Sequence, residues 1–265
     1  FISCSPVNHT FELMDTEQIF QILEEAKLAG VKEFYFTGGE PFIHPKITDI
    51  IAKTLEIGPV TILTNGLSFK NEILKNLRDI HKNSIYSLEI RVSLDSFLEE
   101  EHDKLRGKGT FTKTMLGIKL LIEHDFLPII TVTRTWSDSA EYEAQNTLKK
   151  LLNQLGYTRP RLKFLPVLKI GKEAGRGNEY KEFERITPEM LEDYDKSQLL
   201  CHHSRIATDK GFYTCPILIN SPDAFLGNNL AKAIKPISLN HNACYTCYIW
   251  GAICSNTSSG ETYVR

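Results

Sequence analysis

Strand-like and helix-like patterns alternate through the first two thirds of this 265-residue chain. Short runs rich in β-branched and aromatic residues predict strands, and the segments between them carry apolar residues at helical spacing. The predicted strands are 33–36, 60–63, 88–94, 129–133 and 161–167, and the helices between them are 47–55, 72–80, 110–123 and 140–155. Such units fold as right-handed βαβ crossovers with a parallel sheet. About five units are too few for a closed eight-stranded barrel.

A helix is also expected before the first strand, opened by Asp15 and Gln18 as a capping pair and ended at Gly30. The alternation stops near residue 171, where glycines and charged residues predict a loop. Beyond it we expect a helix over 188–194 and a hairpin over 206–214, followed by irregular, cysteine-rich chain. We therefore predict two domains, 1–185 and 186–265.

Composition restricts the function classes. The net charge of -2 gives no basic surplus for nucleic acid. No apolar run approaches the roughly 20 residues of a membrane helix, and residues 1–10 show no export signal. We therefore expect a cytoplasmic protein with no membrane partner, in which reduced cysteines bind metal rather than form disulfides.

Polar residues follow four successive predicted strands. The segments are Thr37-Gly38-Gly39-Glu40-Pro41, Thr64-Asn65-Gly66, Ser93-Leu94-Asp95-Ser96 and Thr133-Arg134. Ligands of open α/β sheets bind beyond the carboxyl ends of the strands, so these residues predict a pocket at one edge. Each segment alone is equally typical of an ordinary strand-to-helix turn.

Five of the six cysteines lie in the last quarter, at Cys201, Cys215, Cys244, Cys247 and Cys254. Thiolates suit iron–sulfur clusters, and C-x2-C places two sulfurs near one centre. The same spacing permits a structural Cys4 zinc site. His202 and His203 stand beside the first of these cysteines, and packed or exposed histidines are the default interpretation there.

Several of these segments together resemble the radical S-adenosylmethionine (SAM) enzymes. The resemblance rests on 36–42, 63–66 and 92–96, and on Glu100 to Gly107, which is similar to the helix after the family's fourth strand. It covers residues 1–167. It implies an α/β fold, namely a partial (β/α)6 barrel lacking its first strand, followed by a small cysteine-rich α+β extension.

The resemblance also implies which residues bind the cofactor. Gly38 and Gly39 would present backbone to the methionine part, with Glu40 near its amino group. Ser93 and Arg106 would hold the ribose or carboxylate side. The full implied set is Gly38, Gly39, Glu40, Pro41, Asn65, Ser93 and Arg106. For Arg106 a solvated helix arginine is the alternative, for Asn65 a turn cap, and for Arg134 a pair with a surface acid.

One departure from the family concerns its catalytic cluster, which is bound by C-x3-C-x2-C. Cys4 fits none of the three positions, because Phe1, Val7 and Asn8 stand where further cysteines are required. We expect the triplet and the first strand to lie upstream of Phe1. The alternative is a degenerate protein that has lost this cluster.

The C-terminal spacing resembles the auxiliary-cluster extensions of the family, called SPASM or, in a shorter form, twitch domains. Five cysteines fit one auxiliary 4Fe-4S cluster with one to spare. In sulfatase-maturing relatives an aspartate follows the cysteine that matches Cys215, but here Pro216 stands there. That oxidation chemistry is therefore in doubt. Asp209, Tyr213 and Asp223 lie nearby, and no catalytic base is assigned among them.

By resemblance, the function is that of a radical SAM enzyme. A 4Fe-4S cluster and SAM would generate a 5′-deoxyadenosyl radical, and the substrate would be a peptide, a protein or a small molecule. The implied cofactors are the catalytic cluster, the auxiliary cluster and SAM, with an electron donor such as flavodoxin or ferredoxin. The alternative is a non-catalytic binding module stabilised by zinc or iron–sulfur on a relict barrel.

Overall fold

The computed structural model describes residues 10–171, 173–177 and 179–251 of the chain. These residues form two compact units, which are described separately. One unit comprises 30–165, and the other comprises 10–29 together with 166–251. This division reflects compactness, and the domain limits 1–185 and 186–265 stay a prediction.

The first unit is a five-stranded parallel sheet. Its strands are β1 (Phe34–Phe36), β2 (Val60–Thr64), β3 (Leu88–Ser93), β4 (Ile129–Thr133) and β5 (Arg161–Leu165). They lie in the order β1-β2-β3-β4-β5, and every pair is parallel. All five predicted strands and the parallel α/β class are therefore confirmed. All carboxyl ends meet at one edge.

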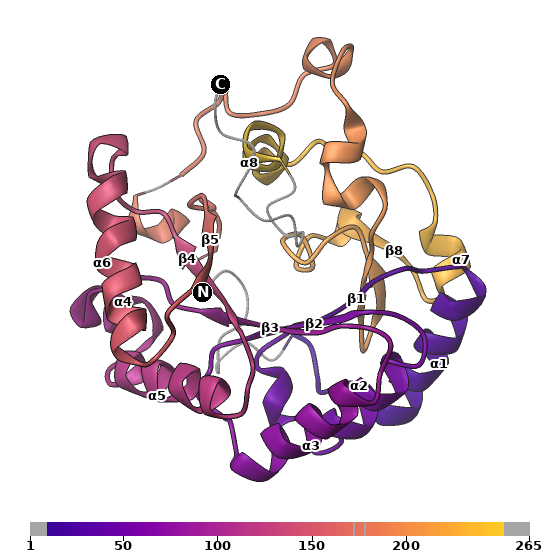
Figure 1. The fold of residues 1–265 in the computed structure, drawn as a ribbon. Helices are drawn as coiled ribbons and strands as arrows, with labels where there is room; N and C mark the ends of the chain where they lie inside the picture. The colour runs from indigo at the N-terminus through magenta and orange to yellow at the C-terminus, as the bar shows by residue number, and fades with distance from the viewer. Residues whose placement is uncertain (1–9, 172, 178, 252–265) are drawn as a thin grey trace. The chain divides into compact units, whose positions relative to one another are not determined.

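Helices connect the strands along one side of this sheet (Figure 1). They are α2 (Ile47–Thr54), α3 (Asn71–Lys82), α4 (Glu99–Arg106), α5 (Thr110–Glu123) and α6 (Glu141–Gln154), with 3-10 turns η1 (Pro41–Ile43) and η2 (Asp138–Ala140). Helix α2, for example, buries an apolar stripe of Ile47, Ile50 and Ile51. The helix predicted over 110–123 is confirmed at both ends.

The second unit contains a three-stranded antiparallel sheet. Its strands are β6 (Ile206–Thr208), β7 (Gly211–Tyr213) and β8 (Phe225–Gly227). Its helices are α1 (Thr16–Leu28), α7 (Leu230–Ala233) and α8 (Asn242–Trp250), and its 3-10 turns are η3 (Ala174–Arg176), η4 (Glu189–Leu191), η5 (Lys196–Gln198), η6 (Leu200–His202) and η7 (Pro222–Ala224). The predicted hairpin is confirmed, with Ile206 opposite Tyr213.

Helix α1 packs with this second sheet although it precedes β1 in the sequence. The Gln18 side chain donates to the Asp209 carbonyl at 3.2 Å, and Glu25 accepts from the Leu230 backbone N–H at 2.8 Å. The predicted capping pair is wrong, because Asp15 occupies the N-cap position without a side-chain hydrogen bond and Gln18 serves this long-range contact instead.

Two further expectations for the C-terminal region are wrong. The helix predicted over 188–194 is only the three-residue turn η4. The cysteine-rich end is not wholly irregular, since α8 carries both Cys244 and Cys247. That helix buries Ala243 and Thr246, so packing rather than a regular apolar stripe stabilises it.

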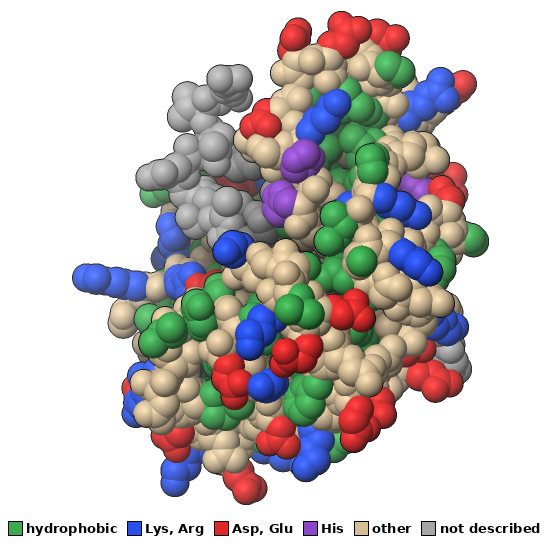
Figure 2. Space-filling view, turned by 90° about the vertical axis from the view of Figure 1, so that its right-hand side faces the viewer, with side chains coloured by type: hydrophobic (Ala, Val, Ile, Leu, Met, Phe, Trp, Pro, Cys, Tyr) green, Lys and Arg blue, Asp and Glu red, His purple; other side chains and the backbone are tan. Residues whose placement is uncertain are grey.

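Acidic and basic side chains are interspersed over the face shown in Figure 2. This mixture matches the small net charge of -2. Among the described residues, no helix is both long and apolar enough to span a membrane.

Candidate functional site

Glu40 connects the ends of two neighbouring strands. Its Oε1 accepts from the Thr64 hydroxyl at 2.7 Å and from the Phe42 backbone N–H at 3.1 Å, and its Oε2 accepts from the Asn65 backbone N–H at 2.8 Å. The residue is only 8% exposed. A carboxylate offers roughly four acceptor positions, so about one is left for a ligand. Glu40 thus holds two strand ends together and also keeps an acceptor position open at the same edge.

The Asn65 side chain caps its own turn. Its Oδ1 accepts from the Leu67 backbone N–H at 2.9 Å, while its carbonyl accepts from the Thr114 hydroxyl of α5. The turn-cap alternative is therefore the observed role of this side chain. The Asn65 backbone N–H still donates to the Glu40 carboxylate at this edge.

Gly38 and Gly39 leave open space beside the backbone at the end of β1. A Cβ added at either position would meet no atom within 4 Å. Gly38 has φ +138°, a conformation that side-chain-bearing residues rarely adopt. Pro41 then begins the turn η1 and is buried. This open, glycine-lined backbone fits the close approach of a small ligand.

Arg106 is not a solvated helix arginine, since it pairs with a buried acid. Its Nε lies 2.6 Å from Asp95 Oδ2, and the Asp95 side chain is 4% exposed. The Thr133 hydroxyl donates to the other Asp95 oxygen at 3.2 Å. Asp95 therefore links the ends of β3 and β4 to α4. Ser93, the last residue of β3, lies half-buried at the same edge.

His102 lies fully buried on α4, with its ring edge-to-face against Phe111 at 5.6 Å. Neither ring nitrogen has a hydrogen-bond partner among the described residues. Burial lowers the pKa of His102, and the Arg106 charge lowers it further. Both effects favour the neutral ring, and the nearby Asp95 and Asp103 carboxylates oppose them.

Arg134, at the end of β4, pairs with acids of the following segment. It bonds Glu141 at 2.7 Å and also contacts Asp138, which is largely exposed. The surface-acid alternative for Arg134 is the one observed. Trp136 donates to the same Glu141 carboxylate at 2.6 Å and packs on Phe164.

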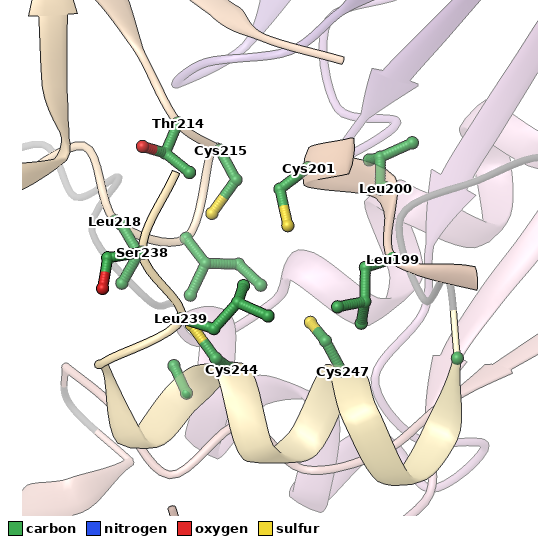
Figure 3. Close-up of a pocket in the computed structure, with 13 residues that line it drawn as sticks. Leu199, Leu200, Cys201, Thr214, Cys215, Leu218, Ser238, Leu239, Cys244 and Cys247 are labelled. Carbon is green, nitrogen blue, oxygen red and sulfur yellow. The ribbon is translucent and has the colours of Figure 1, made fainter. Parts of the chain in front are cut away.

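Four thiols of the second unit line a single pocket (Figure 3). Cys201 lies in η6, Cys215 follows β7, and Cys244 and Cys247 project from α8. The hairpin brings the strand that leads to Cys215 back beside the segment that follows Cys201. Cys4 and Cys254 lie outside the described residues. Four of the five cysteines named from the sequence thus line one pocket, and their role as metal ligands stays a prediction.

The pocket wall is otherwise apolar. Besides the cysteines it is lined by Leu199, Leu200, Thr214, Ile217, Leu218, Ser238, Leu239, Ala243 and Gly251. Burial raises the pKa of the Cys244 thiol to about 11 and raises that of Cys201. These thiols therefore stay protonated unless a metal displaces the proton.

The four thiols are the candidate ligands for either a cluster or a single zinc ion. Among the described residues, no three Cys, His, Asp or Glu side chains lie close enough to hold one metal ion. The four thiols nevertheless line one pocket, so the donor type suits either a cluster or a zinc ion. Leu239 also projects into the pocket, so a cluster requires this side chain to move (Figure 3). His202 and His203 are exposed and do not line it.

The loop that carries Cys201 is fixed by Arg205. Its guanidinium donates to the carbonyls of Cys201 and Ser204 at 2.6 Å each, and to those of Ala233 and Lys235 at 2.9 Å each. A side chain with five donors is suited to holding several carbonyl groups of a loop together. Sequence reasoning did not identify this residue.

Residues 4–139, half of the chain, match the model of the radical SAM superfamily. The matched segment contains the ends of β1 to β4 described above. The chain belongs to the radical SAM superfamily. The expected family is therefore confirmed, and membership of this superfamily implies a 4Fe-4S cluster and SAM as cofactors.

Two curated relatives illustrate the range within this superfamily. A GTP 3′,8-cyclase of Clostridium perfringens is 26% identical over 196 residues, covering 72% of the chain and 54% of the relative. The subtilosin biosynthesis protein AlbA of Bacillus subtilis is 37% identical over 120 residues, covering 43% of the chain and 25% of the relative. The chain thus spans about half or less of these proteins.

Solved structures show the same fold at low identity. The protein anSMEcpe with bound AdoMet matches with a TM-score of 0.61 and 16% identity, over 89% of the chain and 72% of its own. Streptococcus suis SuiB matches with a TM-score of 0.55 and 15% identity, over 83% and 58%. These similarities confirm the radical-SAM-type barrel class.

Sequence reasoning placed Asp95 and Thr64 at the edge but did not predict their partners. Asp95 lies inside the segment that carried the resemblance, but its partner Thr133 is 38 residues away. Thr64 meets Glu40 across 24 residues. The available signal was a polar residue at the end of a strand. The sequence does not show whether such a residue is buried or exposed.

Proposed function

We propose that this chain forms the SAM-binding core and auxiliary-cluster region of a radical SAM enzyme that modifies peptides. The observation that carries the proposal is the family match over the strands whose carboxyl ends form the polar edge. At that edge, Glu40, Asn65 and Asp95 are positioned by hydrogen bonds between strands rather than by flexible loops.

The proposed SAM site consists of Gly38, Gly39, Glu40, Pro41, Asn65, Ser93 and Arg106. Gly38 and Gly39 offer open backbone, and Glu40 retains an acceptor position for an ammonium group. Arg106 uses Nε for Asp95, which leaves other guanidinium N–H groups to bind a carboxylate. The bound cluster and SAM would supply the radical chemistry, and these residues bind and orient SAM.

The auxiliary site consists of Cys201, Cys215, Cys244 and Cys247, with Cys254 as a further candidate. Four thiols around one pocket support a 4Fe-4S cluster there. The hydrogen bonds from Arg205 would hold the Cys201 loop in place for ligation.

A peptide is the favoured substrate class. AlbA, which is 37% identical over its aligned part, is named for bacteriocin biosynthesis. SuiB has been solved with its precursor peptide SuiA, and anSMEcpe with peptides. The cyclase relatives make a nucleotide the main alternative. A flavodoxin- or ferredoxin-type donor would supply the electron.

Binding of SAM to the full-length protein tests the core of this proposal. Gly38→Ala inserts a methyl group into the proposed ligand space and should weaken SAM binding about tenfold by calorimetry. Gly156→Ala is the matched control, because Gly156 also has positive φ and open surroundings but lies after α6. Equal affinities of the two variants would refute the assigned site.

Metal analysis tests the auxiliary site. Anaerobic reconstitution should give iron and acid-labile sulfide in excess of one cluster, and Cys247→Ser should lower both. Zinc bound without sulfide, and lost in the same variant, would instead support a structural metal site.

A further inference from the structure

The turn over residues 64–66, at the end of β2, is held from two sides. On one side, the Asn65 backbone N–H donates to the Glu40 carboxylate at 2.8 Å. On the other side, the Asn65 carbonyl accepts from the Thr114 hydroxyl of α5 at 3.1 Å. Both polar groups of the Asn65 backbone therefore have partners, and α5 supplies one of the two.

Thr114 makes this contact from a fully buried position. A buried threonine in a helix can bond the carbonyl one turn earlier in its own helix. Thr54 does this on α2, where its hydroxyl donates to the Ile50 carbonyl at 2.7 Å. The Thr114 hydroxyl instead donates to a carbonyl 49 residues away in the sequence. Its hydrogen bond therefore joins α5 to the end of β2.

Gly117 lets α5 approach the same turn closely. It lies three residues after Thr114, on the same face of the helix. A Cβ added at Gly117 would overlap the Gly66 carbonyl oxygen and would lie 3.1 Å from the Gly66 carbonyl carbon. Glycine destabilises a helix interior relative to alanine, so this close approach gives a physical reason for Gly117.

The same face of α5 also reaches the turn that carries Glu40. The Cβ position of Gly117 lies 3.1 Å from Cδ2 of Phe69. The Phe69 ring packs edge-to-face on Phe42, with the ring centroids 4.8 Å apart. Phe42 belongs to η1, and its backbone N–H donates to Glu40 at 3.1 Å. Helix α5 therefore contacts the Asn65 turn directly and the Glu40 turn through two aromatic rings.

Apolar packing stabilises α5 independently of these contacts. The helix buries three large apolar side chains, which are Met115, Ile118 and Leu121. Hydrophobic burial is non-directional, whereas a hydrogen bond weakens steeply when its angle changes. The contacts of Thr114 and Gly117 therefore add a defined geometry to a helix that is already packed.

We propose that Thr114 and Gly117 are positioning residues for SAM. They act through the backbone of the Asn65 turn and through Glu40, and they do not touch SAM themselves. A binding site requires its groups to be held within about 0.5 Å of the productive geometry, and buried contacts from a helix provide that support. The inference rests on the proposed function and deepens it, because it names residues that shape the same SAM site.

The test compares two buried threonines in the full-length, anaerobically reconstituted protein. Thr114→Val removes the hydroxyl, keeps the branched shape and should weaken SAM binding about fivefold by calorimetry. Thr54→Val is the matched control, because Thr54 is equally buried and its hydroxyl also donates to a backbone carbonyl. The control should lose similar stability in urea denaturation and keep the wild-type SAM affinity. Thr114→Ser retains the hydroxyl and should restore most of the affinity.

Two further measurements separate positioning from a folding defect. In 5′-deoxyadenosine formation, Thr114→Val should raise the KM for SAM about fivefold and leave kcat within about twofold of wild type. Gly117→Ala should weaken SAM binding about tenfold or more, because the added methyl group overlaps the Gly66 carbonyl.

The outcomes distinguish this inference from the proposed function. If the wild type binds SAM, equal affinities of Thr114→Val and Thr54→Val would overturn the inference. Wild-type affinity in a folded Gly117→Ala protein would also overturn it, as would no recovery of affinity in Thr114→Ser. Failure of the reconstituted wild type to bind SAM would count against the proposed function instead.

Discussion

Glu40 gives the sharpest stability prediction, because its carboxylate accepts three hydrogen bonds at the strand edge. Hydrogen bonds to charged groups contribute about 1.5–3 kcal/mol each, and their removal leaves the donors unsatisfied. Water can enter the emptied space beside the exposed Gly38 and Gly39, which offsets part of this cost. We therefore expect Glu40→Ala to destabilise the protein by about 3 kcal/mol rather than by the full sum.

A variant of Thr64, the hydrogen-bond partner of Glu40, distinguishes loss of these hydrogen bonds from a general loss of packing. Thr64→Val removes one of the three hydrogen bonds, and also the one that the Thr64 hydroxyl accepts from the Gly66 backbone N–H, and should cost about 1.5–2 kcal/mol. Because the two residues are in contact, the double variant should cost about 1 kcal/mol less than the sum of the singles.

Scanning calorimetry provides the measurement. A loss of about 3 kcal/mol should lower the melting temperature by roughly 6–12 °C in a protein of this size. Glu24→Ala, at an exposed position of α1, is the control and should stay within about 0.5 kcal/mol of wild type. A Glu40→Ala effect no larger than that of Glu24→Ala would refute the network.

Three further predictions concern His102, Arg106 and Arg205. His102 has a native pKa below its unfolded value of about 6.5, so the folded state loses stability as pH falls below that value. This loss is no more than about 1.4 kcal/mol per pH unit. His102→Leu should reduce the loss when denaturation is measured at pH 7.5 and 5.5. Arg106→Met should cost about 2–4 kcal/mol by leaving buried Asp95 unpaired, and adding Asp95→Asn should recover part of the loss in urea titrations. Arg205→Met should destabilise the second unit by about 2 kcal/mol, seen as faster hydrogen exchange near Cys201.

Each of these has a contradicting outcome. An unchanged loss of stability between pH 7.5 and 5.5 in the His102 variant would show that another group causes this loss. Strictly additive costs at Arg106 and Asp95 would show that the two do not form a pair. Unaltered exchange in the Arg205 variant would show that its four carbonyl contacts do not hold the loop.

Sequence patterns predicted the parallel unit well, because its strands and helices are locally consistent. The run over 129–133 is rich in β-branched residues, and the helix over 110–123 starts directly after Gly109. Helix α8 was missed, because its Cys, Tyr and Ile residues have modest helix propensity and show no apolar stripe. Tertiary packing decides that helix.

The candidate sites were predicted as residue types but not as partners. The four described thiols that line one pocket were all named from spacing alone. The pairing of Arg106 with Asp95, and of Glu40 with Thr64, was not predicted, since the first joins helix α4 to the end of β3 and the second joins two strand ends. Which polar residue at a strand end faces a ligand and which braces its neighbour depends on burial, which spacing does not encode.

The central claim is that the chain serves radical SAM chemistry. The most direct test is to reconstitute the full-length protein anaerobically, reduce it in the presence of SAM and measure 5′-deoxyadenosine by mass spectrometry. We predict time-dependent 5′-deoxyadenosine formation in the wild type, and much less in Gly38→Ala than in Gly156→Ala. No 5′-deoxyadenosine from a wild type that has incorporated iron and sulfide would contradict the account.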